Sequence, residues 1–354
     1  MTRAWVEVDL GALRRNAAAM AARAPAIVPM VKADAYGLGA VPVACALESL
    51  APWGYGVATV DEGIELRAAG IARPVLVFTP VVRGELGALR EARLTPALGS
   101  AADLACWAEA GGGAWHLAID TGMSRAGARW DAVDAMRGAI AALPPEGAFT
   151  HFHSAELDDG SAAVQAERFS EALGRLPAMP PLVHAENSAA LARVTRSRWN
   201  LGRPGIFLYG VGSGAGALVH PEPVVRVRAR LVDVRDVRAG ESVSYDATYR
   251  AEAPRRIATL AIGYADGYRR ALSNRGVAIV HGHRAPVVGL VTMDMTMIDV
   301  TGVPCQPGDV ATLIGDEGEE RLDVERVAGL AALSPYELLT GLRGRLPRLY
   351  HEGA

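Results

Sequence analysis

The sequence predicts an α/β protein, with a (β/α)8 TIM-like barrel over residues 1–223 followed by a mostly β C-terminal domain over residues 224–354. Two observations support this division. In the first two-thirds of the chain, short apolar segments alternate with helical patterns, whereas after about Pro223 the apolar residues recur with a period of two. A doubly wound open sheet is the alternative for the first region, because it also alternates strands with helices.

The first region holds eight strand-like segments, as many as a closed barrel needs. Helical patterns separate them. The clearest of these, Asp61–Ala69, ends at Gly70, and glycine commonly terminates helices. Sequential strand–helix units joined by right-handed crossovers favour closure into a barrel. The segments begin near Ile27, Tyr55, Val75, Leu94, Trp115, Ala148, Leu182 and Trp199.

The second region is predicted to consist mainly of strands. Val225–Leu231 alternates apolar and charged residues, which is typical of a strand with one face exposed. Three further apolar runs, over 256–262, 276–280 and 310–314, are separated by Gly and Pro. A region of this length is a normal size for a domain.

Composition excludes several classes of function. The chain has 354 residues, a net charge of −3 and no block of Lys or Arg, so nucleic acid and anionic membranes are poor candidates as partners. We find no apolar stretch long enough to span a bilayer and no signal segment. The three cysteines are widely spaced and form neither a disulfide framework nor a metal motif, so no metal is expected. The sequence therefore predicts a soluble cytoplasmic protein.

Lys32 directly follows the apolar run 26–31. Burial disfavours a charged ammonium group, so a lysine at this position is a candidate for a Schiff base with an aldehyde cofactor. Tyr36, one helical turn further on, can present its hydroxyl to the same point, and Gly37 and Gly39 would let the backbone approach a bulky anion. The alternative is a lysine whose stem packs on apolar surface while its head reaches water.

Polar residues also follow four later strand-like segments, where barrel enzymes place their active sites. After the seventh and eighth strands, Ser188, Gly205 and Ile206 suit a phosphate, which backbone N–H groups and a hydroxyl can bind. Ser188 could instead simply cap the helix after it. His116, His184 and His220 lack metal-ligand spacing, and we expect them to be structural or surface residues. The polar segments are 120–125, 150–153, 184–188 and 200–206.

Beyond these patterns, the chain resembles the alanine racemase family, whose members are fold-type III enzymes that depend on pyridoxal phosphate. The resemblance runs from Trp5 to beyond Tyr336. It implies a barrel followed by a β domain, interconversion of L- and D-alanine, a supply of D-alanine for peptidoglycan, and a homodimer with shared active sites. The matching motifs are VKADAYGLG, DTGMSRAG, THF, HAENSAA, NLGRPGIFLYG, VSYDATY, IGYADGY, TMDM and PYE.

The resemblance assigns two bases. Lys32 matches the lysine that binds the cofactor and then acts on one face of the substrate, and Tyr245 matches the opposing base, delivered by the partner subunit. Two bases on opposite faces can remove a proton from Cα and return one to the other side. The implied cofactor-binding positions are Tyr36, Ser188, Gly205, Ile206 and Tyr336 for the phosphate, Arg203 for the pyridine nitrogen, and His151 in support of that arginine.

Four further residues are implied near the substrate. Arg125 matches an arginine close to the substrate carboxylate, and Met293 matches the partner residue whose backbone N–H meets that carboxylate. Asp294 lies next to Met293, and Tyr264 matches a tyrosine at the entrance. Arg203 is expected to stay charged, so it cannot readily accept a proton from the pyridine nitrogen of the cofactor. That nitrogen should therefore stay unprotonated, which weakens the ring as an electron sink and should suppress side reactions such as transamination.

The chain departs from the family pattern at four positions. Asp34 and Leu38 replace the common Asn and His of the lysine motif, and Glu156 stands where many members have Asp. Ala118 occupies the position of a lysine that members commonly carry in N-carboxylated form and that orients the arginine matching Arg125. Alanine cannot be carboxylated, so a chloride ion, ordered water or a nearby carboxylate is expected in its place.

Three alternatives remain open from the sequence. One is a racemase of the same family that also accepts serine or other amino acids. A decarboxylase on the same architecture would need a carboxylate near the pyridine nitrogen, where this chain has Arg203. A non-enzymatic protein of pyridoxal phosphate homeostasis would leave the region after Pro223, with Tyr245, unexplained.

Overall fold

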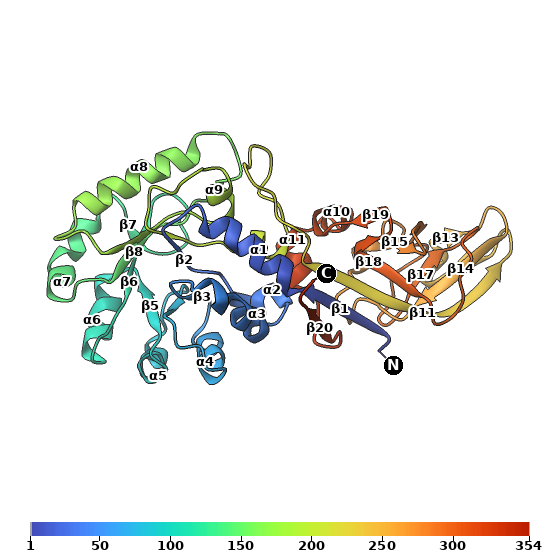
Figure 1. Cartoon of the computed structure of the whole chain (residues 1–354), viewed down its shortest axis with the longest axis horizontal. Coiled ribbons are helices and arrows are strands. Elements are labelled where there is room, and N and C mark those ends of the chain that lie inside the picture. Colours follow the sequence, from blue (N-terminus) through green and yellow to red (C-terminus); the bar gives the residue numbers. More distant parts are fainter. Residues whose placement is uncertain (1, 354) are drawn as a thin grey trace.

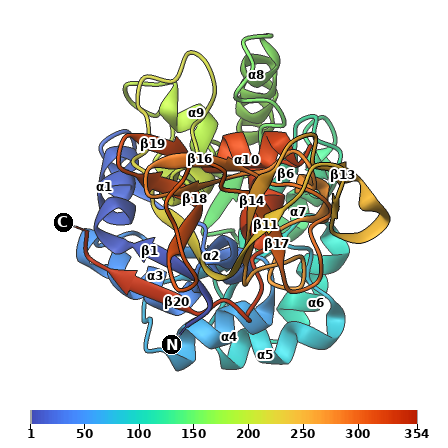
Figure 2. The ribbon, with the colours of Figure 1, turned by 90° about the vertical axis from the view of Figure 1, so that its right-hand side faces the viewer.

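The structure, a computed structural model, describes residues 2–353 and has two regions arranged along its long axis (Figure 1). The barrel lies at one end and a β-rich region at the other. Seen from the β-rich end, the sheet of that region stands in front of the barrel (Figure 2). No helix in residues 2–353 has the length and apolar character needed to cross a membrane.

Eight parallel strands close the barrel. Six of them pair in sequence from β3 to β9, and β10 pairs with β2. Single bridges complete the circle, from Met30 to Gly56 between β2 and β3 and from Asn187 to Arg203 between β9 and β10. The predicted barrel is thus confirmed, and the open sheet is excluded. The strands are β2 (Ala26–Ile27), β3 (Tyr55–Val57), β4 (Val75–Val77), β5 (Thr95–Leu98), β6 (His116–Asp120), β8 (Gly147–Phe149), β9 (Leu182–His184) and β10 (Leu201–Gly202).

Helices α4 to α8 surround these strands (Figure 1). α4 begins where the Thr59 hydroxyl and the Glu62 carboxylate cap each other's backbone, and it ends just before Gly70, whose φ of +87° suits glycine. The predicted helix at this place is therefore confirmed. The barrel helices are α1 (Leu10–Ala21), α3 (Ala40–Leu47), α4 (Val60–Ala68), α5 (Leu86–Glu91), α6 (Ala101–Glu109), α7 (Arg137–Ala142), α8 (Ser161–Gly174) and α9 (Ser188–Ala192).

The β-rich region is built on a nine-stranded sheet. The four segments expected after Pro223 appear in it as β11, β14, β15 and β18. β1 also belongs to this sheet, because it pairs antiparallel with β11. The β-rich sheet thus includes a strand that precedes residue 223, and the domain division at that residue stays a prediction. The strands are β1 (Ala4–Asp9), β11 (Val225–Val237), β14 (Arg255–Leu260), β15 (Val277–Val280), β16 (His283–Pro286), β17 (Thr296–Asp299), β18 (Val310–Glu317), β19 (Glu320–Leu322) and β20 (Arg348–His351).

Smaller elements complete the chain, and two of them connect its regions. α11 lies between β19 and β20 in sequence and packs against α2, the short segment that begins with Lys32. α11 starts at Pro335, capped by Ser334 and Glu337, which fixes the position of Tyr336 at the barrel opening. These elements are α2 (Lys32–Gly37), β7 (Ala128–Arg129), β12 (Ser242–Val243), β13 (Tyr249–Arg250), α10 (Val324–Leu330) and α11 (Pro335–Thr340).

Candidate active site

A cavity of about 880 Å³ lies at the carboxyl ends of the barrel strands. This volume is within the range of small-molecule binding sites, and its position is the one where barrel enzymes carry out their chemistry. The cavity brings together nine of the residues predicted from the sequence: Lys32, Tyr36, Arg125, His151, Ser188, Arg203, Gly205, Ile206 and Tyr336.

Lys32 is followed by a left-handed turn, not by the ordinary helical turn expected from the sequence. Residues 33–36 have φ of 53°, 55°, 50° and 58°, although none of them is glycine. This conformation costs about 1–2 kcal/mol per residue for L-amino acids, so other contacts must hold it. The Glu62 carboxylate accepts the N–H of Ala33 at 2.6 Å, and Asp34 accepts the N–H of Ala40 at 2.7 Å. Asp34 thus supplies the acceptor oxygen that asparagine would also supply.

Gly37 and Gly39 have a different role from the predicted approach to an anion. Both have positive φ, of +85° and +97°. A Cβ atom on Gly37 would lie 2.6 Å from the carbonyl oxygen of Leu339, and one on Gly39 would collide with the hydroxyl of Tyr350. These glycines therefore let the C-terminal part of the chain pack on the lysine loop, and neither of them lines the cavity.

The environment of Lys32 favours a neutral amine. Burial lowers the pKa of Lys32, and the positive charges of Arg125 and Arg203 lower it further, while Glu62 acts in the opposite direction. The neutral amine is the form that attacks an aldehyde and the form that accepts a proton. Lys32 is therefore suited to both of the roles predicted for it.

Arg203 lines the cavity and is buried, with 3% of its surface exposed. Its guanidinium donates to His184 Nδ1 at 2.8 Å and to the carbonyl oxygens of Thr150 at 2.7 Å and Ala185 at 3.1 Å. Burial lowers the pKa of Arg203 to about 9, so the group stays positively charged at neutral pH. The side chain is fixed in place and is a hydrogen-bond donor only.

Two histidines contact Arg203, and the shorter contact is not the predicted one. His151 Nδ1 lies 3.4 Å from the guanidinium, whereas His184 Nδ1 lies at 2.8 Å. From the sequence, His184 is expected to be a structural or surface residue, although its place at the end of the seventh predicted strand pointed to the cavity. Burial and the charges of Arg203, Arg125 and Lys32 lower the pKa of His151 to about 3, so this ring is neutral at physiological pH.

Ser188 lies at the centre of a set of hydrogen-bond donors. Its Oγ accepts the N–H of Gly205 at 2.8 Å and that of Phe207 at 3.3 Å, so its own proton remains free to be donated. The cap of α9 is Asn187, which accepts the N–H of Ala190 at 3.1 Å, and the capping alternative for Ser188 was therefore wrong. A Cβ atom at position 205 would collide with the Tyr36 hydroxyl, so any larger residue there would displace Tyr36.

Two tyrosines complete this set. The rings of Tyr36 and Tyr336 lie 6.0 Å apart, and Tyr36 packs against Tyr209 at 4.7 Å. Burial raises the pKa of Tyr36 and of Tyr336, so both hydroxyls stay protonated and can donate. We call the hydroxyls of Tyr36, Ser188 and Tyr336 the hydroxyl cluster. Its neutral donors suit a phosphate group, which accepts hydrogen bonds strongly.

Ala118 stands at the position expected for a lysine that orients Arg125, and the surroundings of both residues differ from that expectation. Arg125 is exposed, and no carboxylate in residues 2–353 lies within ion-pair distance of it. Ala118 is buried in an apolar cluster with Ala97 and Phe149, against which Phe78 packs. Among the occupants expected beside Ala118, a carboxylate paired with Arg125 is thus not found in the described part of the chain.

The remaining four predicted residues lie outside the cavity of their own chain, on the β-rich region. Tyr245, Met293 and Tyr264 are 69%, 53% and 38% exposed. Tyr264 and Met293 are neighbours, because successive backbone N–H groups at 264 and 265 bind the carbonyls of Thr292 and Met293. Asp294 pairs with Arg345 at 2.8 Å.

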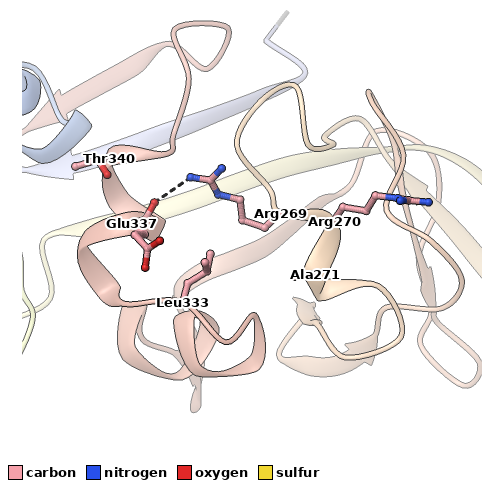
Figure 3. Close-up of a pocket in the computed structure, with 6 residues that line it drawn as sticks. All are labelled: Arg269, Arg270, Ala271, Leu333, Glu337 and Thr340. Carbon is pink, nitrogen blue, oxygen red and sulfur yellow. Dashed lines mark hydrogen bonds between the residues drawn. The ribbon is translucent and has the colours of Figure 1, made fainter.

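A second, smaller cavity of about 330 Å³ lies beside α11 (Figure 3). The Arg269 guanidinium points toward α11 and donates to the carbonyl oxygen of Glu337 at 3.0 Å, whereas Arg270 extends away from it. Arg269 thus supports the helix that carries Tyr336. Within residues 2–353, no group of three or more His, Cys, Asp or Glu side chains is arranged to hold a metal ion.

The fold and the cavity define a class of protein: a barrel enzyme whose cavity holds a lysine, a buried arginine and donors for an anionic group. Residues 8–213 match the family model for the alanine racemase N-terminal domain, and residues 224–350 match that for the alanine racemase C-terminal domain. The chain therefore belongs to the alanine racemase family.

Individual relatives agree with this assignment over nearly the whole chain. The alanine racemase of Symbiobacterium thermophilum is 39% identical over 98% of this chain and 96% of its own length, and that of Carboxydothermus hydrogenoformans is 38% identical over 98% and 99%. The crystal structure of alanine racemase from E. faecalis has a TM-score of 0.94 at 32% identity, covering 99% of this chain and 98% of that one. The alanine racemase structure from Bartonella henselae, which contains covalently bound pyridoxal phosphate, has a TM-score of 0.92 at 28% identity, covering 99% and 100%.

Proposed function

We propose that this protein is a pyridoxal phosphate-dependent racemase that interconverts L-alanine and D-alanine. One observation carries the proposal: Lys32 is the only lysine among the 36 Lys and Arg residues of the chain, and it lies in the same cavity as Arg203 and the hydroxyl cluster. A primary amine condenses with an aldehyde, whereas a guanidinium does not. A chain that uses arginine at every other basic position thus keeps lysine where this chemistry is needed.

The residues of the cavity fit pyridoxal phosphate. Lys32 would bind its aldehyde, and Arg203, held by His184 and beside His151, would donate to its pyridine nitrogen. The hydroxyl cluster, with the backbone at Gly205 and Ile206, would bind its phosphate, and the unused proton of Ser188 agrees with this. When bound, the cofactor holds the amino acid covalently and stabilises the negative charge at Cα. The covalently bound cofactor of the Bartonella relative supports the same assignment.

The side chains of this chain would then move the proton. The Lys32 amine accepts the α-proton on one face of the substrate and returns a proton to that face in the reverse reaction. Its lowered pKa increases the share of the neutral amine, the form that accepts a proton. Arg125, exposed and unpaired with any carboxylate in residues 2–353, is available to bind the substrate carboxylate.

The second base, Tyr245, lies outside the cavity of its own chain, so we propose a homodimer in which the partner subunit supplies it. Its exposure of 69% and that of Met293, 53%, support this arrangement, because aromatic and methionine side chains are enriched in protein interfaces. In the dimer, the Met293 backbone and Asp294 would border the substrate, and Tyr264 would border the entrance.

The proposed substrate is alanine, the proposed role is to supply D-alanine for peptidoglycan, and the proposed location is the cytoplasm. The three cysteines are free thiols, which is the usual state in a reducing compartment. A racemase of wider range, accepting serine as well, is the second candidate, because Ala118 leaves Arg125 without a protein carboxylate to orient it.

The test is a racemisation assay combined with covalent labelling. Purified protein supplied with pyridoxal phosphate should convert L-alanine to a racemic mixture. Borohydride reduction should leave one label per chain, on Lys32. Because Lys32 is the only lysine, the Lys32→Arg variant is a matched control that should take up no label except at the N-terminal amine. No racemisation of alanine, or a label absent from Lys32, would reject the proposal.

A further inference from the structure

A row of polar side chains leads from Arg203 through the barrel interior to its opposite end. His184 Nδ1 lies 2.8 Å from the Arg203 guanidinium, and His184 Nε2 lies 2.8 Å from His116 Nδ1. His116 Nε2 lies 3.6 Å from the Glu146 carboxylate. His116 is the first residue of β6, and Glu146 immediately precedes β8, so the row ends at the amino-terminal side of the barrel.

The positions of the protons in this row follow from its first member. Arginine has only donors, so His184 Nδ1 must accept a hydrogen bond and its proton must lie on Nε2. That Nε2–H then donates to His116 Nδ1, which must also be an unprotonated acceptor. The remaining proton of His116 lies on Nε2 and points toward Glu146. Both hydrogen bonds of the row therefore run in one direction, from Arg203 through His184 to His116, and the Glu146 carboxylate faces the last N–H at 3.6 Å, beyond hydrogen-bond distance.

Both histidines are neutral in this arrangement. His116 and His184 are 0% exposed. Burial and the charge of Arg203 lower the pKa of His184, and burial lowers the pKa of His116 against the opposing effect of Glu146. A second positive charge beside Arg203 in this dry interior would be strongly disfavoured. The row thus carries one cation at one end and one carboxylate at the other.

We propose that His116 and Glu146 are positioning residues for Arg203. His116 accepts the Nε2–H of His184 and Glu146 attracts the Nε2–H of His116, so the two residues stabilise the tautomer in which His184 presents an acceptor to the guanidinium and holds it in a single orientation toward the cavity. If His184 carried its proton on Nδ1, two N–H groups would face each other and this contact would be lost. Outer partners commonly set the tautomer of a histidine in this way. The ligand of Arg203, a pyridine nitrogen, rests on the proposed function, whereas the tautomers do not.

The tautomers can be measured in the protein without cofactor. Nitrogen-15 NMR of histidine-labelled protein separates protonated from unprotonated ring nitrogens. We expect His116 and His184 to be neutral, each with its proton on Nε2. A proton on Nδ1 of His184, or a doubly protonated ring at neutral pH, would overturn the proposal, whatever the enzyme's reaction turns out to be.

The positioning role is tested by ligand binding with matched variants. His116→Leu removes the acceptor for His184, and His116→Asn retains an oxygen acceptor near the place of Nδ1. The probes are pyridoxal phosphate and its 1-deaza analogue, which has C–H in place of the pyridine nitrogen. We expect His116→Leu to weaken binding of pyridoxal phosphate by roughly 10-fold and binding of the analogue much less, as the loss of an outer partner typically does.

His116→Asn should bind both probes nearly as the unaltered protein does. Glu146→Gln, which keeps an acceptor near the exposed end of the row, should show a smaller effect in the same direction as His116→Leu. Equal weakening of both probes by His116→Leu would indicate a merely structural role and would overturn the proposal. If the unaltered protein bound neither probe, the proposed function would fail, and the NMR result would still decide the tautomers.

Discussion

The two regions of the molecule treat their functional side chains in opposite ways. In the barrel, Arg203 is 3% exposed and is held by several hydrogen bonds, and Lys32 directly precedes a turn held by Glu62. On the β-rich region, Tyr245 and Met293 are 69% and 53% exposed. The functional side chains of the barrel are thus held in place by contacts within their own chain, whereas those of the β-rich region are exposed on its surface.

Under the proposed two-base mechanism, this difference would explain how the cavity of one chain can hold Lys32 while Tyr245 lies outside it. A side chain that binds a cofactor within its own chain can be buried and oriented during folding. One that completes the site of another subunit must stay at the surface until the subunits meet. The dimer proposal follows from this contrast, and the predictions below test it.

The largest expected effect is that of Lys32→Ala. Loss of the amine removes both the attachment of the cofactor and one base, and a general base alone contributes ~10²–10⁴-fold. Racemisation should therefore fall by at least roughly 10³-fold in both directions. Steady-state assays starting from each enantiomer measure this. Near-normal activity in either direction would mean that the barrel side of the site has been assigned wrongly.

Tyr245→Phe should have a directional effect. If Tyr245 acts on one face only, removal of the α-proton from one enantiomer should fall by ~10²–10⁴-fold, and removal from the other should fall far less. Single-turnover exchange of the α-proton for deuterium, measured separately for L- and D-alanine, gives both rates. Equal losses for the two enantiomers would contradict the two-base interpretation.

A smaller effect concerns stability on the barrel side. The pKa of His151 is about 3 in the folded protein, below the ordinary histidine value, so between these values only the unfolded chain takes up the proton. The free energy of unfolding should therefore fall as the pH is lowered from about 6.5 toward 4, by up to about 1.4 kcal/mol per pH unit from this residue.

The measurement is urea unfolding of the protein without cofactor over this pH range. His151→Asn should make the pH dependence shallower, and His220→Asn, at an exposed position, should leave it unchanged. The same slope in His151→Asn as in the unaltered protein would show that His151 titrates normally.

The last prediction concerns bicarbonate, which is expected to have no effect on the activity of the unaltered protein. Because Ala118 has no amine to carboxylate, activity should not respond to added bicarbonate. Ala118→Lys should be tolerated at the edge of the cavity and should introduce a bicarbonate dependence. Assays with and without bicarbonate at constant pH and ionic strength test both statements. A rise in the activity of the unaltered protein with bicarbonate would contradict the account.

The barrel and most of its rim were predictable from the sequence, because parallel strands bring their carboxyl ends to one edge wherever they lie in the chain. Lys32, Ser188 and Arg203 follow three different strands and lie in one cavity for this reason. The role of β1 was not predictable in the same way, because its partner β11 is distant in sequence.

Local patterns also failed where distant contacts decide the backbone or the proton positions. Nothing within 33–36 indicates left-handed conformation, which depends on the Glu62 carboxylate from another segment. The Thr59-x-x-Glu62 spacing indicates a capping box, but it does not indicate that the Glu62 carboxylate also accepts the N–H of Ala33. The contact between His184 and His116 required the pairing of β6, β8 and β9 to be known.

The most direct test of the shared site mixes two inactive proteins, Lys32→Ala and Tyr245→Phe. After subunit exchange, half of the dimers should be hybrids, and one site in each hybrid receives both Lys32 and Tyr245. The mixture should therefore recover about a quarter of the activity of the unaltered protein, as expected for a symmetric dimer. If verified subunit exchange restores no activity, the two bases do not meet across a subunit interface, and the account is contradicted.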